Sequence, residues 1–141
     1  ELAKEYGADE IIFTDKTKLE DYPFEKGGVD RVLVTAPPRT IGSACNVTNV
    51  GGIVAFLGIS YGPDAIVSFD SNVVHLRKLQ IRGSNAIPAL YFPRCIDMIK
   101  AGLVDTKKLI SHVFPLEETP EALEHYREDR AHALKAVMVN K

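Results

Sequence analysis

The sequence predicts an α/β fold with an open, mostly parallel sheet and an additional pair of strands near its C-terminal end. Short, nearly uninterrupted apolar runs rich in Val and Ile are typical of strands in a parallel sheet. Segments with helical periodicity or capping residues separate these runs, and strand, helix and strand within about 30 residues form a βαβ unit. The balance of 45% hydrophobic and 26% charged residues over 141 positions fits one soluble globular domain.

The first predicted elements are the end of a helix and a short strand. Residues 1–6 are helix-prone and lead to Gly7, a residue favoured just after a helix C-terminus. Because the chain opens on Glu1 rather than Met, we expect it to begin inside a helix and to be a segment of a longer protein. Residues 10–14 are apolar and β-branched, which predicts a strand.

The central part of the chain predicts the βαβ unit. Residues 31–36 are apolar after the first position and predict a strand buried on both faces. The Pro-Pro pair that follows ends this strand, because proline cannot donate to a ladder. Residues 41–49 predict a short helix, and a Gly-Gly turn leads into a strand over 53–59.

The next segment predicts a helix over 73–78, a strand over 79–84 and then a longer amphipathic helix. Five apolar residues of that last helix fall at i, i+3, i+4, i+7 and i+11, which places them on one helix face. They are Phe92, Cys95, Ile96, Ile99 and Leu103. Gly102 is expected to end this helix.

The C-terminal part predicts two strands around one helix. Residues 110–116 form a strand or extended run, and residues 134–140 form the final strand. Between them, Thr119 as N-cap and Pro120 at the first helical position begin a helix that runs towards Arg130.

This arrangement predicts a ligand edge. Open α/β sheets bind ligands at the carboxyl ends of their strands. The residues 35–36, 58–60 and 84–86 follow the three central strands, so we expect them at one edge of the sheet. Gly58 and Gly83 end strands there, where a missing side chain either forms a turn or lets a flat ring or backbone come close.

Composition excludes several classes of protein. A net charge of -2 without blocks of like charge argues against nucleic-acid binding. No apolar stretch is long enough to span a bilayer, and no signal peptide opens the chain. Cys45 and Cys95 lie far apart, as expected for free thiols in a reducing compartment, so we expect a cytoplasmic protein rather than a disulfide scaffold.

Residues with reactive side chains suggest no catalytic or metal centre. The four histidines lack metal-ligand spacing and are expected at the surface or half buried: His75, His112, His125 and His132. There is no G-x-S-x-G motif and no G-x-G-x-x-G phosphate loop. Lys135 precedes an apolar run, where it either protects an edge strand or pairs with a phosphate.

Five stretches in order resemble the C-terminal part of zinc-dependent medium-chain alcohol dehydrogenases, nearest to the sorbitol and polyol dehydrogenases. They read ELAKEYGADEIIFTD, GGVDRVLVTAPP, GGIVAFLGI, LQIRGSNA and LISHVFPLEETPEALEHYREDRAHALKAVMVN. The resemblance implies a partial Rossmann domain, doubly wound with a mostly parallel sheet, that lacks its first two strands and carries a C-terminal strand pair. It assigns residues 1–108 to this NAD(P)-binding domain, and residues 109–141 to a tail that in relatives returns to the catalytic domain.

The resemblance also implies cofactor contacts for individual positions. Thr35 and Ala36 match positions beside the riboses. The other positions match residues near the nicotinamide (Leu57, Gly58 and Ile59), near its carboxamide (Ser84 and Asn85), and at the pyrophosphate (Lys135). At Pro37-Pro38 the chain departs from the glycine-containing turn of many relatives, and the double proline is expected to stiffen the loop beside the adenosine.

The function that the resemblance implies is hydride transfer from a secondary alcohol or polyol to NAD or NADP. Zinc would belong to the parent protein, with its ligands outside this segment, and the segment alone is expected to be inactive. Two alternatives stay open: a zinc-free quinone or enoyl reductase of the same superfamily, and a non-catalytic nucleotide-binding or oligomerisation module. We further expect a homo-oligomer with no nucleic-acid or membrane partner.

Overall fold

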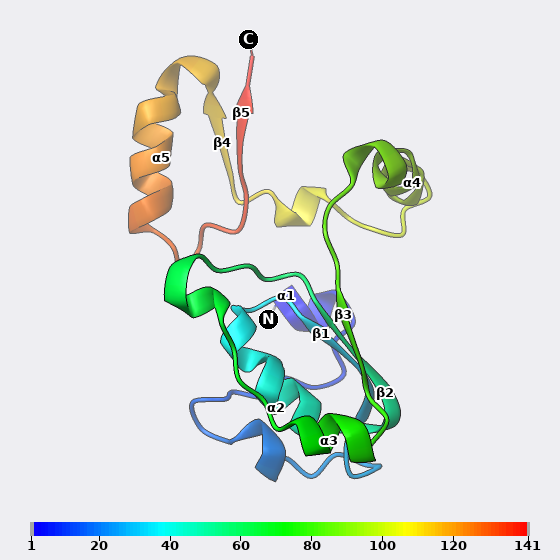
Figure 1. Cartoon of the computed structure of the whole chain (residues 1–141). Coiled ribbons are helices and arrows are strands. Elements are labelled where there is room, and N and C mark those ends of the chain that lie inside the picture. Colours follow the sequence, from blue (N-terminus) through cyan, green and yellow to red (C-terminus); the bar gives the residue numbers. More distant parts are fainter. Residues whose placement is uncertain (1, 141) are drawn as a thin grey trace. The chain divides into compact units, whose positions relative to one another are not determined.

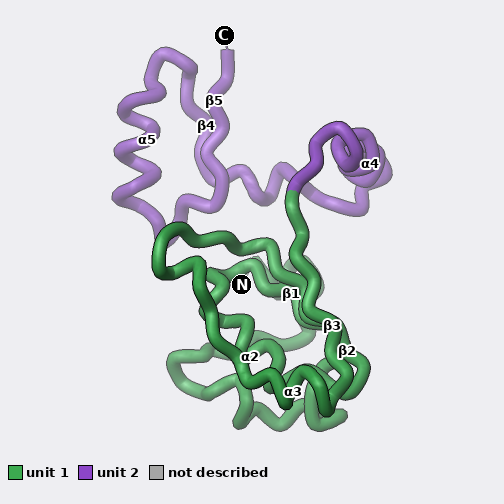
Figure 2. Tube along the Cα trace, in the orientation of Figure 1, with its two compact units in different colours: residues 1–85 green, residues 86–141 purple. Residues whose placement is uncertain are grey.

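The structure, a computed structural model, describes residues 2–140. Within them the chain forms two compact units, residues 2–85 (unit 1) and residues 86–140 (unit 2), shown in different colours in Figure 2. Each unit has its own strands and helices and is described by itself.

Unit 1 contains a parallel sheet with the order β1-β2-β3 in the described residues. Its strands are β1 (Val29–Val34), β2 (Thr48–Phe56) and β3 (Gln80–Gly83). Their order along the chain is also their order in the sheet, as the βαβ prediction requires. The predicted parallel α/β architecture is therefore confirmed.

Helices α2 (Ile41–Asn46) and α3 (Ser71–Leu76) pack against this sheet, and both lie on the same side of the strands in Figure 1. Helix α1 (Leu2–Glu5) precedes them. The buried cluster between α2 and the sheet is apolar and consists of Val34, Ile41, Ala44, Cys45, Val54 and Leu79. Burial of this kind contributes about 25 cal/mol per Å² of apolar surface, so the cluster holds the strands and helices together.

Strand β2 begins earlier than the sequence predicts, and helix α2 ends earlier. The hydroxyl of the fully buried Thr48 donates a hydrogen bond to the Ala44 carbonyl at 2.6 Å, where the helix gives way to the strand. The register of β2 against β1 shifts near its start, where Gly51 has φ +76°. This left-handed conformation suits glycine because it has no Cβ.

The predicted strand at 10–14 is absent: these residues are irregular, with a turn beginning at Thr14. Ile11 and Phe13 are exposed, the latter by 60%. A strand needs a neighbour for its backbone N–H and C=O groups, and among the described residues β1 pairs only with β2. An apolar, β-branched run was therefore not enough to form a strand.

Burial of β1 on both faces was also wrong. Val34 is buried, whereas Leu33 is 64% exposed. Successive side chains of a strand point to opposite faces, so one face of β1 packs on the core and the other is open at Leu33.

Unit 2 contains helices α4 (Pro88–Lys100) and α5 (Thr119–Glu128) and strands β4 (His112–Pro115) and β5 (Ala136–Val139). The two strands pair in parallel, which confirms the predicted C-terminal pair. Helix α4 confirms the amphipathic prediction, but its apolar side chains are largely exposed, Phe92 and Ile99 among them.

The predicted N-cap role of Thr119 was wrong. Thr119 is the first residue of α5, Glu118 precedes it as N-cap, and the Thr119 hydroxyl donates to the Leu116 carbonyl at 2.5 Å. Short 3-10 turns complete the chain at Leu19–Asp21, Pro38–Thr40, Gly62–Ala65, Lys107–Leu109 and Leu116–Glu118.

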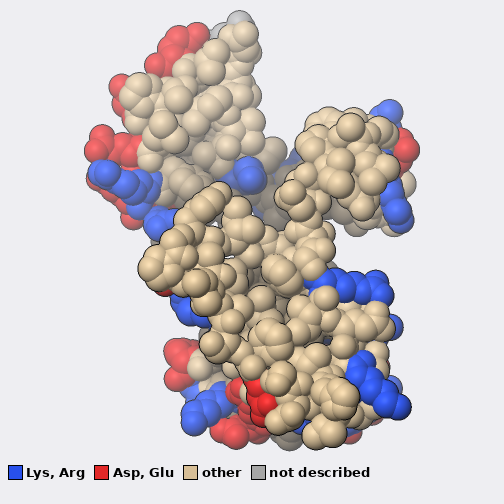
Figure 3. Space-filling model, in the orientation of Figure 1, with Lys and Arg blue, Asp and Glu red and all other residues tan. Residues whose placement is uncertain are grey.

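Basic and acidic side chains are scattered over the face shown in Figure 3, with no extended basic patch on it. Among the described residues, no helix has the length and apolar character that crossing a bilayer would require.

Candidate cofactor site at the carboxyl edge of the sheet

The three strands of unit 1 end together. Val34 pairs with Phe56, and Phe56 pairs with Gly83, so the last residues of β1, β2 and β3 are in register. The ladder continues one step further, because the N–H groups of Leu57 and Ser84 donate to the carbonyls of Val34 and Phe56, both at 2.9 Å. The segments that carry the predicted site residues therefore leave the sheet at one edge.

A cavity of about 270 Å³ lies between the ends of β2 and β3. It is lined by Phe56, Leu57, Ile59, Gly83, Ser84 and Asn85. Four predicted site residues thus come together here, supplying apolar side chains on one strand end and a hydroxyl and an amide on the other. Such a lining suits a flat, partly apolar ring that also carries hydrogen-bonding groups.

Gly58 lies against the loop that follows β1. A Cβ at position 58 would clash with the Ala36 carbonyl, and it would lie 3.6 Å from Cα of Pro37. The sequence left open whether Gly58 forms a turn or allows a close approach, and the structure shows a close approach of the backbone. The loops after β1 and β2 therefore approach each other closely at the edge of the sheet.

Thr35 and Ala36 line a second cavity, of about 470 Å³. Sequence reasoning missed its other wall, which includes Lys18, Leu19 and Glu20. These residues precede β1 and belong to no motif, so only the folded chain brings them to this edge.

Glu20 is the acidic group in this wall. Its pKa lies below the ordinary value because its carboxylate accepts a backbone hydrogen bond and, more weakly, bonds from Ser43 and Asn46. The Asn46 amide donates to its Oε1 at 3.3 Å. Its carboxylate can accept hydrogen bonds at the wall of this cavity.

Lys135 belongs to unit 2 and is not part of these cavities. Its backbone is fixed by Ser111, whose N–H donates to the Lys135 carbonyl at 3.0 Å. Its side chain is exposed and forms no hydrogen bond or ion pair with the described residues.

The described residues offer one group of three potential metal ligands, namely His112, His125 and Asp129. Sequence spacing did not reveal it, because the fold places a strand histidine against a helix. Among the same residues, neither Cys45 nor Cys95 belongs to such a group.

The family profile of zinc-binding dehydrogenases matches residues 1–101. The chain belongs to this family. Its predicted membership is confirmed, and the open, parallel α/β architecture described above agrees with it.

Individual relatives agree along nearly the whole chain. It is 30% identical to the scyllo-inosose 3-dehydrogenase of Thermotoga maritima over 99% of its length, and 27% identical to the starvation-sensing protein RspB of Escherichia coli over 98%. It spans only 36% and 40% of these two proteins.

A solved relative gives the same result in three dimensions. The crystal structure of the alcohol dehydrogenase rspB from Escherichia coli CFT073, complexed with NADH, superposes with a TM-score of 0.83 at 26% identity. The match covers 95% of this chain and 39% of that one.

Proposed function

We propose that this chain forms the nicotinamide side of the cofactor site in an NAD- or NADP-dependent zinc alcohol or polyol dehydrogenase. The whole enzyme would transfer a hydride from a secondary alcohol to the cofactor. The observation that carries the proposal is the common edge where β1, β2 and β3 end in register beside the cavity of about 270 Å³. Parallel α/β sheets bind their ligands at such an edge.

In this proposal the chain binds and orients the cofactor. The backbone of 57–59 packs against the nicotinamide ring, and Ser84 and Asn85 meet its carboxamide. Thr35 and Ala36 lie beside the riboses, and Lys135 pairs with the pyrophosphate. The side chain of Lys135 is exposed and lacks a protein partner among the described residues, which leaves its charge available.

The redox chemistry belongs to groups that this chain does not itself supply. When bound, NAD(P) accepts the hydride and zinc polarises the alcohol oxygen. We assign residues 1–108 to the cofactor domain and 109–141 to a tail that meets the catalytic domain. We also propose that the parent enzyme is a cytoplasmic homo-oligomer without nucleic-acid or membrane partners.

Activity of the parent protein tests the function. We expect reduction of NAD⁺ or NADP⁺ that depends on a secondary alcohol from a polyol panel. Absence of any such reaction in correctly folded, zinc-loaded protein would contradict the proposal. Reduction of quinones or enoyl substrates instead would favour the zinc-free branch of the superfamily.

A pair of matched variants tests the site. Ile59→Asp places a negative charge in the cavity. The control is Leu76→Asp on α3, because Leu76 is 74% exposed and Ile59 is 73% exposed. We expect Ile59→Asp to raise KM for the cofactor by about tenfold or more, which corresponds to a loss of about 1.4 kcal/mol of binding free energy. Equal effects of both variants would argue against the assigned edge.

A further inference from the structure

The C-terminal unit brings together two imidazoles and a carboxylate. His112 lies on β4, His125 lies on α5, and Asp129 follows the end of that helix. One ligand atom from each lies within 4.8 Å of the others. Metal-ligand bonds to nitrogen and oxygen are about 2.0–2.2 Å long, so two donors on one ion lie at most about 4.4 Å apart, and a small rotation of these side chains would let a single ion reach all three.

The fold explains why these residues meet. His125 and Asp129 are four positions apart, so they lie on one side of α5 and its terminus. Strand β4 lies beside this helix, and the rings of His112 and His125 are 5.0 Å apart between centroids, at an angle of 68°. The three groups thus come from two elements that pack against each other.

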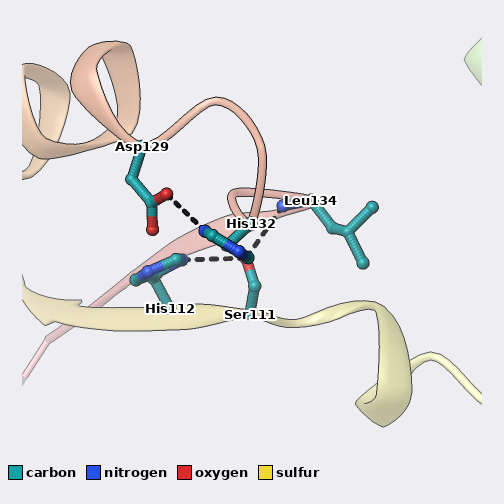
Figure 4. A network of polar contacts seen from close by, with 5 residues as sticks. All are labelled: Ser111, His112, Asp129, His132 and Leu134. Carbon is teal, nitrogen blue, oxygen red and sulfur yellow. Dashed lines mark hydrogen bonds and ion pairs between the residues drawn. The ribbon is translucent and has the colours of Figure 1, made fainter. Parts of the chain in front are cut away.

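A second set of side chains holds two of these groups in place (Figure 4). His132 Nδ1 lies 2.6 Å from the Asp129 carboxylate, and Ser111 Oγ lies 2.9 Å from His112 Nδ1. Ser111 is itself anchored, since it accepts the N–H of Leu134 at 3.0 Å. Metal-binding imidazoles and carboxylates are usually oriented by such outer hydrogen bonds.

The hydrogen bonds also allow the required protonation states. When His112 donates its Nδ1 proton to Ser111, and the Ser111 hydroxyl donates to the Lys135 carbonyl 3.2 Å away, Nε2 of His112 keeps a free lone pair.

We propose that His112, His125 and Asp129 bind a divalent transition-metal ion such as Zn²⁺ or Co²⁺. Two imidazoles with one carboxylate suit these ions better than the all-oxygen ligand sets that Mg²⁺ and Ca²⁺ prefer. The ion would link β4 to α5, with its remaining coordination positions open to water. This inference goes beyond the proposed dehydrogenase function and does not depend on it.

Titration of the purified 141-residue chain with ZnCl₂ by isothermal calorimetry tests the site. We expect one ion per chain. Loss of a residue that only orients a metal ligand typically weakens metal affinity by 10–100-fold, and His132→Gln should weaken Zn²⁺ binding by no more than about this factor. His125→Gln and Asp129→Asn each remove a ligand and should weaken Zn²⁺ binding by more. His75→Gln, on α3 in unit 1, is the matched control and should bind as the parent chain does.

Co²⁺ gives an independent spectroscopic readout. Its d–d absorption should appear at one equivalent without a thiolate charge-transfer band, and Cys95→Ser should leave the spectrum unchanged. Far-UV circular dichroism checks that each variant is folded. The proposal is overturned if the folded chain binds neither ion, if His125→Gln and Asp129→Asn bind like the parent chain, or if His75→Gln weakens binding equally.

Discussion

At the scale of single residues, Gly58 illustrates how one missing side chain shapes the site. The Ala36 carbonyl occupies the space that a Cβ at position 58 would need. Backbone cannot move away as a flexible side chain can, so the fit depends on glycine at this position.

Gly58→Ala should lower the free energy of unfolding by about 1–3 kcal/mol, the usual cost of overpacking. Gly42→Ala is the matched control: its Cβ would meet the nearest atom at 3.6 Å, and alanine favours the α2 helix by about 0.5–1 kcal/mol. Urea unfolding of both variants measures the difference. Loss of stability in Gly42→Ala but not in Gly58→Ala would contradict the described contact.

The two free cysteines differ in their exposure to solvent. Cys45 is buried in the core of unit 1, whereas Cys95 is exposed on α4. Burial raises the pKa of the Cys45 thiol above its ordinary value of 9.0.

In native protein at neutral pH, Ellman's reagent should therefore modify Cys95 and leave Cys45 unmodified until the chain unfolds. The raised pKa also implies a pH dependence: the stability from a neutral Cys45 is fully present below pH 9.0, and is lost as pH rises through the higher folded-state pKa. Cys95→Ser should abolish the fast reaction. Fast modification of Cys45 in the folded chain would contradict its burial.

At the scale of elements, Arg77 joins α2, β2 and α3. It caps α3, and its Nη1 donates to the carbonyl of Asn46 at 2.7 Å and to that of Thr48 at 3.2 Å. The carbonyls at a helix C-terminus lack partners within the helix and carry partial negative charge, so a cation is favourable there.

Arg77→Met keeps much of the side-chain stem but removes both hydrogen bonds. It should lower the free energy of unfolding by about 1.5–3 kcal/mol, the range for bonds to charged groups. Arg82→Met, at an exposed position of β3, should change it by less than about 0.5 kcal/mol. Thermal unfolding followed by circular dichroism compares the two, and equal losses would show that Arg77 has no special role.

At the scale of the whole molecule, this chain exposes apolar faces that a stable fold normally covers. The side chains of α4 are the clearest case, with Phe92, Ile96 and Ile99 all exposed. Strand β3 also has a free edge among the described residues, since it pairs only with β2. Large apolar patches and free edges favour association.

The chain should therefore self-associate, with a weight-average mass that rises with concentration in sedimentation equilibrium. Phe92→Lys together with Ile99→Lys should reduce this association if α4 contributes to it. Leu123→Lys, an exposed position on α5, is the control. A monomer at all concentrations would contradict the prediction.

The sequence determined most of the elements and the edge at which the candidate site lies. Apolar runs and helix signals located the strands of both sheets to within a few residues, because these signals are local. The carboxyl edge follows from strand order, so the sequence alone places Thr35, Leu57 and Ser84 at one edge of the sheet. Family resemblance added their roles, which remain proposals.

Tertiary structure alone decided the features that depend on distant partners. Residues 10–14 have strand-forming side chains but no strand beside them, and β1 is covered on one face only. Glu20 reaches the edge, and His112 meets His125, through packing between separate elements. Periodicity in a sequence reports local geometry, whereas pairing, burial and ligand clusters depend on which segments the folded chain brings together.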